Sequence, residues 1–143
     1  MSDPNEKLKK EIWQSFVEQQ HVHLATVDGD QPRLRPVTLI RLGGKLFVAT
    51  GAGDAKVRHI ERHPKAEFCL LLEKGDQKGT IRAQCTARFV EDKKVKADAY
   101  KKIPFMKDFW PSPEDPRYAL IELEPSRFEY MRRGSTEALK VSN

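Results

Sequence analysis

Cysteine is scarce in this chain of 143 residues, which holds only Cys69 and Cys85 and no Cys-x-x-Cys pair. Both lie in apolar stretches typical of strands, which favours buried free thiols in a reducing compartment over a disulfide framework or a cysteine metal site. Long apolar runs are also missing, and residues 1–10 lack the apolar core of a signal peptide. We therefore expect a cytoplasmic protein without a membrane-spanning segment.

Neither a block of one charge nor a metal-binding pattern is present. The 26 Lys and Arg residues and 21 Asp and Glu residues, with a net charge of +5, are interleaved, and aromatic residues do not alternate with the basic ones. This pattern disfavours nucleic-acid binding. The four histidines form two pairs, His21/His23 at strand spacing and His59/His63 at helix spacing, and no carboxylate or thiol completes a ligand set. We expect no metal site.

The apolar pattern predicts one mainly β domain. A chain of this length with 38% hydrophobic residues suits a single core. Apolar stretches bounded by turn residues predict six strands, and stretches with helical periodicity predict three helices. The expected strands are 21–27, 33–42, 45–50, 66–72, 80–90 and 118–131, while the helices begin at Pro4, follow Asp54 and span 92–102. These elements suit a small antiparallel β-barrel with peripheral helices.

Two segments fall outside this regular pattern. Residues 105–116 contain Phe109, Trp110 and several prolines, which predicts an ordered aromatic loop without a regular element. Residues 134–143 are polar and are expected to form a loose C-terminal tail. The predicted domain therefore spans residues 1–133.

Residues 33–64 contain the clearest candidate binding site. Gly43-Gly44 joins two predicted strands as a hairpin turn, and a second glycine-rich turn leads to Asp54, a good N-cap for the helix that follows. A helix start exposes unpaired N–H groups and the positive end of the helix dipole, both of which favour an anion. The residues alone therefore indicate a phosphate site without identifying the ligand.

Four motifs follow one another here: Arg35-Pro36-Val37-Thr38, Leu46-Phe47-Val48-Ala49-Thr50, Lys56 with Ile60, and His63-Pro64. In this order and spacing the chain resembles the FMN-binding split-barrel family related to pyridoxamine 5′-phosphate oxidase. The resemblance extends from about His21 to about Arg132. Phe109-Trp110-Pro111 and Asp115-Pro116 are similar to a pattern in short, general-stress-protein-like members. The resemblance implies a six-stranded antiparallel split barrel and a homodimer, with FMN in a groove between the subunits.

Position by position, the resemblance implies which residues hold the cofactor. Arg35 matches the phosphate-binding arginine, and Lys56 matches the basic residue at the start of the short helix. Ala55 stands where pyridoxamine phosphate oxidases have a second basic residue, so Arg33 or Arg58 is the candidate to supply that charge. Cofactor contacts are also implied for residues along the ring, the ribityl chain and the phosphate, namely Pro36, Val37, Thr38, Ala49, Thr50 and Gly51.

Several of these positions have a purely structural alternative. Thr80 falls where the family often has a polar contact to the flavin, supplied in many members by the other subunit, and it also suits an ordinary strand residue. Trp110 either caps the flavin or substrate pocket or pins its loop to the core. Arg33 and Arg35 alternate as they would on a solvated sheet face, and Lys56 suits an ordinary helix surface.

The leading functional hypothesis is an FMN-dependent oxidoreductase with a small-molecule electron donor and acceptor. The isoalloxazine ring carries the redox chemistry, so we assign no catalytic side chain, and the substrate is unknown. Pyridoxamine phosphate oxidation itself is disfavoured, because the chain ends soon after Tyr130-Met131 without the C-terminal extension of the true oxidases. The alternatives are an F420-dependent reductase on the same barrel and a non-enzymatic flavin- or haem-binding module.

Overall fold

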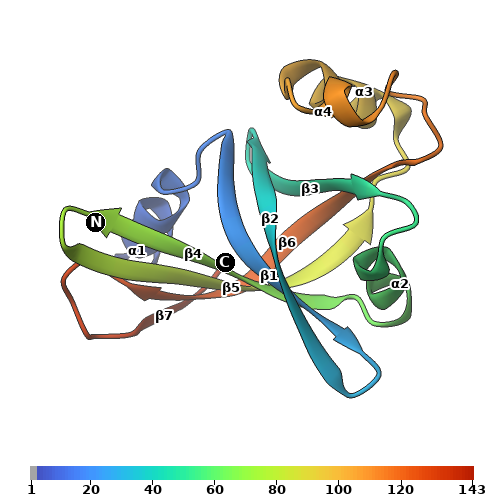
Figure 1. The fold of residues 1–143 in the computed structure, drawn as a ribbon. Coiled ribbons are helices and arrows are strands. Elements are labelled where there is room, and N and C mark those ends of the chain that lie inside the picture. Colours follow the sequence, from blue (N-terminus) through green and yellow to red (C-terminus); the bar gives the residue numbers. More distant parts are fainter. Residues whose placement is uncertain (1–2) are drawn as a thin grey trace.

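The computed structural model describes residues 3–143, which contain seven strands and four helices (Figure 1). In chain order they are α1 (Pro4–Gln14), β1 (Gln19–Asp28), β2 (Gln31–Leu42), β3 (Lys45–Gly51), α2 (Ala55–Arg62), β4 (Lys65–Lys74), β5 (Gln77–Phe89), α3 (Lys93–Lys102), α4 (Met106–Phe109), β6 (Tyr118–Met131) and β7 (Leu139–Ser142). No helix within these residues is long and apolar enough to cross a membrane.

The strands form one antiparallel sheet that closes into a split barrel. Neighbouring strands follow the order β3-β2-β1-β4-β5-β6-β7, and the pairing of β3 with β6 closes the ring. β1 pairs with β2 along its whole length but with β4 only from His23 to Ala25. Six strands therefore form the barrel, as the sequence predicts, and β7 extends the sheet beyond β6.

The main core lies inside the barrel beneath α1. Alternate residues of β1 are buried, namely Val22, Leu24 and Thr26, and the rings of Phe68 and Phe128 fill the centre. Helix α1 begins where Asp3 Oδ1 accepts the N–H of Asn5 at 3.0 Å, while Pro4 occupies a position that needs no N–H donor. Ile12 of this helix is fully buried in the same core.

A second apolar cluster joins the α3–α4 segment to the barrel. Ile103 and Met106 are fully buried in this cluster, together with Ile40 and Phe47 of the barrel. In Figure 1 the two helices stand at one end of the molecule, above β3 and β6. The cluster therefore fixes the α3–α4 segment, which projects from the barrel.

The C-terminal segment is ordered, which corrects the expectation of a loose tail at residues 134–143. Residues Leu139–Ser142 form β7, which pairs with Arg127–Tyr130 of β6, and Val141 is buried in the main core. The alternation of Leu139 and Val141 is too short to predict a strand by itself. Pairing with β6 supplies the stabilisation that the local sequence lacks.

Two features near prolines also have a clear outcome. Residues 105–116 are not free of regular structure, because Met106–Phe109 form the short helix α4. Within the last strand, Pro125-Ser126 predicts a bend, and the β5–β6 register shifts between Gln84 and Cys85, opposite these residues. An extra residue in one strand of a pair produces such a bend.

Candidate functional site

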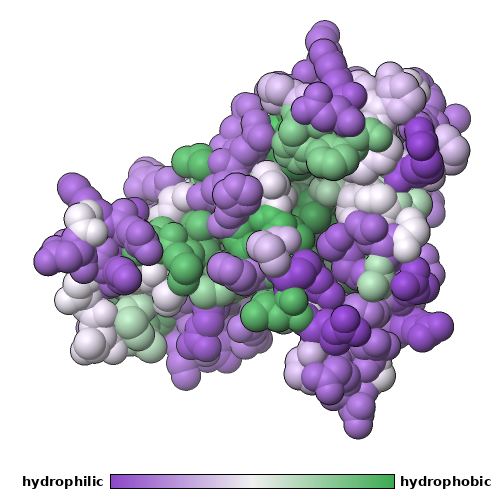
Figure 2. All heavy atoms as spheres, viewed as in Figure 1, coloured by the Kyte–Doolittle hydropathy of each residue, from purple (hydrophilic) through white to green (hydrophobic). Residues whose placement is uncertain are grey.

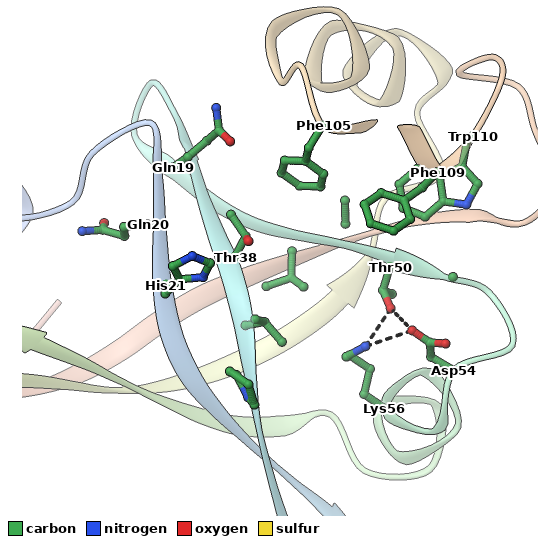
Figure 3. Close-up of a pocket in the computed structure, with 15 residues that line it drawn as sticks. Gln19, Gln20, His21, Thr38, Thr50, Asp54, Lys56, Phe105, Phe109 and Trp110 are labelled. Atoms are coloured by element: carbon green, nitrogen blue, oxygen red, sulfur yellow. Dashed lines mark hydrogen bonds and ion pairs between the residues drawn. The ribbon is translucent and has the colours of Figure 1, made fainter. Parts of the chain in front are cut away.

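A cavity of about 770 Å³ opens between the barrel and the α3–α4 segment. Figure 2 shows hydrophobic residues gathered at the centre of this face, next to the α3–α4 segment. The lining residues come from β1, β2, β3, the start of α2 and the α4 region (Figure 3), and they are Gln19, Gln20, His21, Pro36, Val37, Thr38, Val48, Ala49, Thr50, Gly51, Asp54, Lys56, Phe105, Phe109 and Trp110.

The separation of β2 from β3 creates the cavity. The two strands pair only near their hairpin turn, up to Ile40 opposite Phe47. Beyond this point β2 pairs only with β1, and β3 pairs with β6. The facing edges of Pro36–Thr38 and Val48–Thr50 therefore have no strand partner and leave main-chain groups available to a ligand. Apolar side chains of the same residues give this wall a mixed polar and apolar character.

Three side chains form a hydrogen-bonded cluster where β3 leads into α2. Thr50 Oγ1 donates to Asp54 Oδ2 at 2.6 Å, and Lys56 Nζ donates to Thr50 Oγ1 at 2.8 Å and to Asp54 Oδ2 at 3.1 Å (Figure 3). The hydrogen bonds from Thr50 and Lys56 lower the pKa of Asp54, so its carboxyl is ionised at neutral pH. The Lys56 side chain is 14% exposed.

Asp54 occupies the N-cap position of α2, as the sequence predicts, but its side chain does not cap the helix. The carboxylate faces Thr50 and Lys56 instead. The first N–H groups of α2 therefore donate no hydrogen bond to this side chain. The start of the helix remains a positive end beside the cavity.

Aromatic side chains from the α4 region form the opposite wall. Phe105 and Phe109 lie edge to face with ring centroids 6.2 Å apart, and Phe109 is 66% exposed (Figure 3). Trp110 is only 7% exposed, because its ring lies on Tyr118 with centroids 4.9 Å apart. The Tyr100 hydroxyl donates to the main-chain oxygen of Trp110 at 2.7 Å. Trp110 thus both lines the cavity and pins the α4 region to the barrel.

Eight of the eleven residues singled out from the sequence line this cavity. They are Pro36, Val37, Thr38, Ala49, Thr50, Gly51, Lys56 and Trp110. The structure does not bring Arg33, Arg35 or Thr80 into it. Arg33 lies 3.5 Å from the Asp28 carboxylate, and Thr80 lies on β5 opposite Leu71 and Met131.

Arg35 takes part in a separate hydrogen-bond network outside the cavity. Its Nη1 donates to the main-chain oxygen of Leu24 at 3.1 Å, and its Nη2 lies 3.4 Å from His59 Nδ1, which is also 2.9 Å from Thr26 Oγ1. Because a guanidinium can only donate, we assign Nδ1 as the acceptor and place the ring proton on Nε2, which lies 3.7 Å from Asp28 Oδ2. His59 of α2 is thereby fixed to the β1–β2 hairpin.

The buried position of His59 makes it resist protonation. Desolvation is the main cause of its lowered pKa, and Arg35, Arg33 and Arg58 add to the effect, while Asp28 opposes it. The folded protein therefore keeps this imidazole neutral at pH values where the unfolded chain has already taken up a proton.

The free energy of unfolding is expected to fall as the pH drops below about 6.5, the ordinary pKa of histidine. The unfolded state binds the proton first, so stability rises with pH in this window and levels off below the folded-state pKa. Urea unfolding between about pH 5 and 7.5 should show a shallower dependence for His59→Gln than for the unmodified protein. Equal slopes would mean that His59 titrates normally.

Seven lining residues were not identified as ligand contacts from the sequence. They are Gln19, Gln20, His21, Val48, Asp54, Phe105 and Phe109. The alternation of buried and exposed residues places His21 on the outer face of β1 next to Thr38, so a predicted β1–β2 hairpin offers a signal for it. Gln19 and Gln20 precede the predicted strand and carry no such signal. Among residues 3–143, no group of three or more His, Cys, Asp or Glu side chains is placed to hold a metal.

Comparison with known proteins identifies the family. The sequence profile described as pyridoxamine 5′-phosphate oxidase matches residues 8–132, so the chain belongs to this family. Its fold is the split barrel of that family. No curated protein matches the sequence.

Solved structures support the same assignment. General stress protein 26 from Bacillus anthracis str. Sterne is 27% identical, with a TM-score of 0.75 over 94% of this chain and 98% of that chain. A NimC/NimA family protein from Clostridium acetobutylicum is 24% identical, with a TM-score of 0.74 over 88% and 86% of the two chains. HutZ, a haem-storage protein from Vibrio cholerae, is 18% identical, with a TM-score of 0.65 over 91% and 95%. The last two similarities concern the fold alone.

Proposed function

We propose that this protein binds FMN in the cavity and acts as an FMN-dependent oxidoreductase on a small molecule. The observation that carries the proposal is the combination of unpaired strand edges along one wall with donor groups at one end of the same cavity. A flat heterocycle with a phosphorylated tail needs both features. Membership of the pyridoxamine 5′-phosphate oxidase family supports the choice of a flavin.

The lining fits a flavin in size and chemistry. A volume of about 770 Å³ lies within the range of roughly 300–1,000 Å³ that is usual for small-molecule sites. The edges of Pro36–Thr38 and Val48–Thr50 offer main-chain donors and acceptors to the polar edge of a ring, and Val37 and Ala49 offer apolar contact. Lys56 and Thr50 lie beside the positive end of α2, where a tail phosphate is favoured.

The lining indicates what the chain and a bound cofactor would each contribute to the reaction. A bound flavin supplies the transfer of hydride or electrons. The residues of the chain would hold the ring between the strand edges and the side chains of Phe105 and Phe109. No lining side chain is required as an acid or base, and we assign none.

We propose that the protein is a homodimer whose second subunit completes the site. The outer face of the sheet next to the cavity carries Leu34, which is 69% exposed, and Leu71, which is 54% exposed. Thr80 pairs with Leu71 and lies on this same face. A second copy covering the face would remove both leucines from water, which favours association. In such a dimer Thr80 of the partner subunit would be the residue that contacts the flavin, because Thr80 does not line the cavity of its own chain.

Native mass spectrometry of the purified protein tests cofactor and assembly together. The expected species has twice the chain mass of 16.5 kDa and carries two cofactor molecules. Visible absorption should show an oxidised flavin, and the mass of the released cofactor should be that of FMN rather than F420. A colourless protein that takes up no added FMN would overturn the proposal, and a monomer that binds FMN would overturn only the dimer.

Haem binding is the second candidate function. The observation that favours it is His21, whose exposed imidazole lines the cavity and whose type is a common haem-iron ligand. HutZ, which shares this fold, is a haem-storage protein. Titration with haemin separates the two candidates. A haem protein should develop an intense Soret band, and His21→Ala should weaken that band. A flavoprotein should develop no Soret band.

A further inference from the structure

The geometry points to Asp54 as a carboxylate within the site that opposes the phosphate of the ligand and so sets how strongly the site prefers FMN over riboflavin. This inference rests on the proposed function. Asp54 Oδ2 accepts hydrogen bonds from both Thr50 and Lys56, which are the two side-chain donors available to a tail phosphate at this end of the cavity. The protein's own anion therefore already uses the donors that the phosphate needs.

The position of Asp54 is fixed by its surroundings. Its main-chain N–H donates to the carbonyl oxygen of Gly51 at 3.0 Å, which holds the turn between β3 and α2. The side chain is 53% exposed, and a methyl group added at Gly51 would lie in ordinary contact with Asp54 Oδ1, at 3.4 Å. Together with the bonds to Thr50 and Lys56, these contacts hold the carboxylate toward the cavity (Figure 3).

The charges of the lining residues explain why Asp54 would lower the preference of the site for FMN. Lys56 and Asp54 are the only Lys, Arg, Asp or Glu side chains among the described residues that line the cavity, and their charges cancel. A phosphate monoester carries a charge of about −1.5 to −2 at pH 7. When it approaches Lys56, it also meets the Asp54 carboxylate, and the repulsion offsets much of the attraction. Riboflavin has no phosphate and does not meet this repulsion.

Asp54→Asn tests the inference directly. Asparagine keeps the shape and an acceptor oxygen for Thr50 and Lys56 but removes the negative charge. FMN affinity should rise about tenfold, while riboflavin affinity should change by less than about twofold. Fluorescence quenching of each flavin on titration with apoprotein gives both dissociation constants. Asp54→Ser, which also removes the charge, should shift the FMN to riboflavin ratio in the same direction.

Asp76→Asn is the matched control, because this residue lies in the exposed β4–β5 turn and makes the same change in net charge outside the cavity. It should leave both dissociation constants within about twofold. FMN binding that is unchanged or weaker in Asp54→Asn and in Asp54→Ser would overturn the role of Asp54 and leave the flavin site intact. If neither flavin binds to the unmodified protein or to the variants, the proposed function fails and this inference fails with it.

Discussion

Replacing Lys56 with alanine is expected to weaken FMN binding by about a hundredfold while changing riboflavin binding by less than about threefold. Lys56 is the only cationic Lys or Arg side chain among the described residues that line the cavity, and it already lies 2.8 Å from Thr50 and 3.1 Å from Asp54. Its removal takes away the phosphate contact and also leaves the Asp54 carboxylate without its counter-ion. Titrating apoprotein with each flavin measures the two losses.

Two matched variants show whether this loss comes from the site. Lys10→Ala removes an exposed lysine of α1 and should leave both affinities unchanged. Arg35→Ala should weaken the two flavins to a similar extent, because its guanidinium contacts Leu24 and His59 rather than the cavity. A selective loss of FMN in Arg35→Ala would show that Arg35 turns into the site when the phosphate binds. Equal losses of FMN and riboflavin in Lys56→Ala would place the phosphate elsewhere.

The sequence predicts most of this fold because its signals are local. Gly29, Gly43 and Gly75 lie in the turns of three hairpins, and all three have positive φ angles that glycine adopts without strain. Strand β7 has no such signal, since two apolar residues in a polar segment gain their stability only from β6. Helix α4 is likewise fixed by burial of Met106 and Trp110 in the second apolar cluster rather than by local periodicity.

The candidate site is harder to predict because it depends on contacts between distant segments. The strand and turn motifs place Thr50 and Lys56 together, since they lie on either side of one short turn. No sequence pattern shows whether Arg35 faces the cavity or His59. The alternation of side chains along β2 does not say which of the two faces of the strand meets the cavity. Asp54 suits an ordinary N-cap in the sequence, and only the folded turn shows that its carboxylate contacts Lys56 instead.

The aromatic wall provides the second large expected effect. Trp110→Ala should lower the free energy of unfolding of the ligand-free protein by about 4 kcal/mol. The indole is 7% exposed and lies on Tyr118, so its removal takes a large buried side chain out of the second apolar cluster. Urea unfolding of apoprotein measures this cost without a contribution from ligand binding.

Phe109→Ala is the control that separates pinning of the α4 region from contact with a ligand. Phe109 lines the same cavity but is 66% exposed, so its removal should cost less than about 1 kcal/mol of stability. If Trp110 pins the segment, only its loss should destabilise the apoprotein, and it should also weaken flavin binding because the wall carrying Phe105 and Phe109 loses its attachment to Tyr118. Similar small losses of stability in both variants would mean that Trp110 only lines the cavity and that Ile103 and Met106 attach the α3–α4 segment to the barrel.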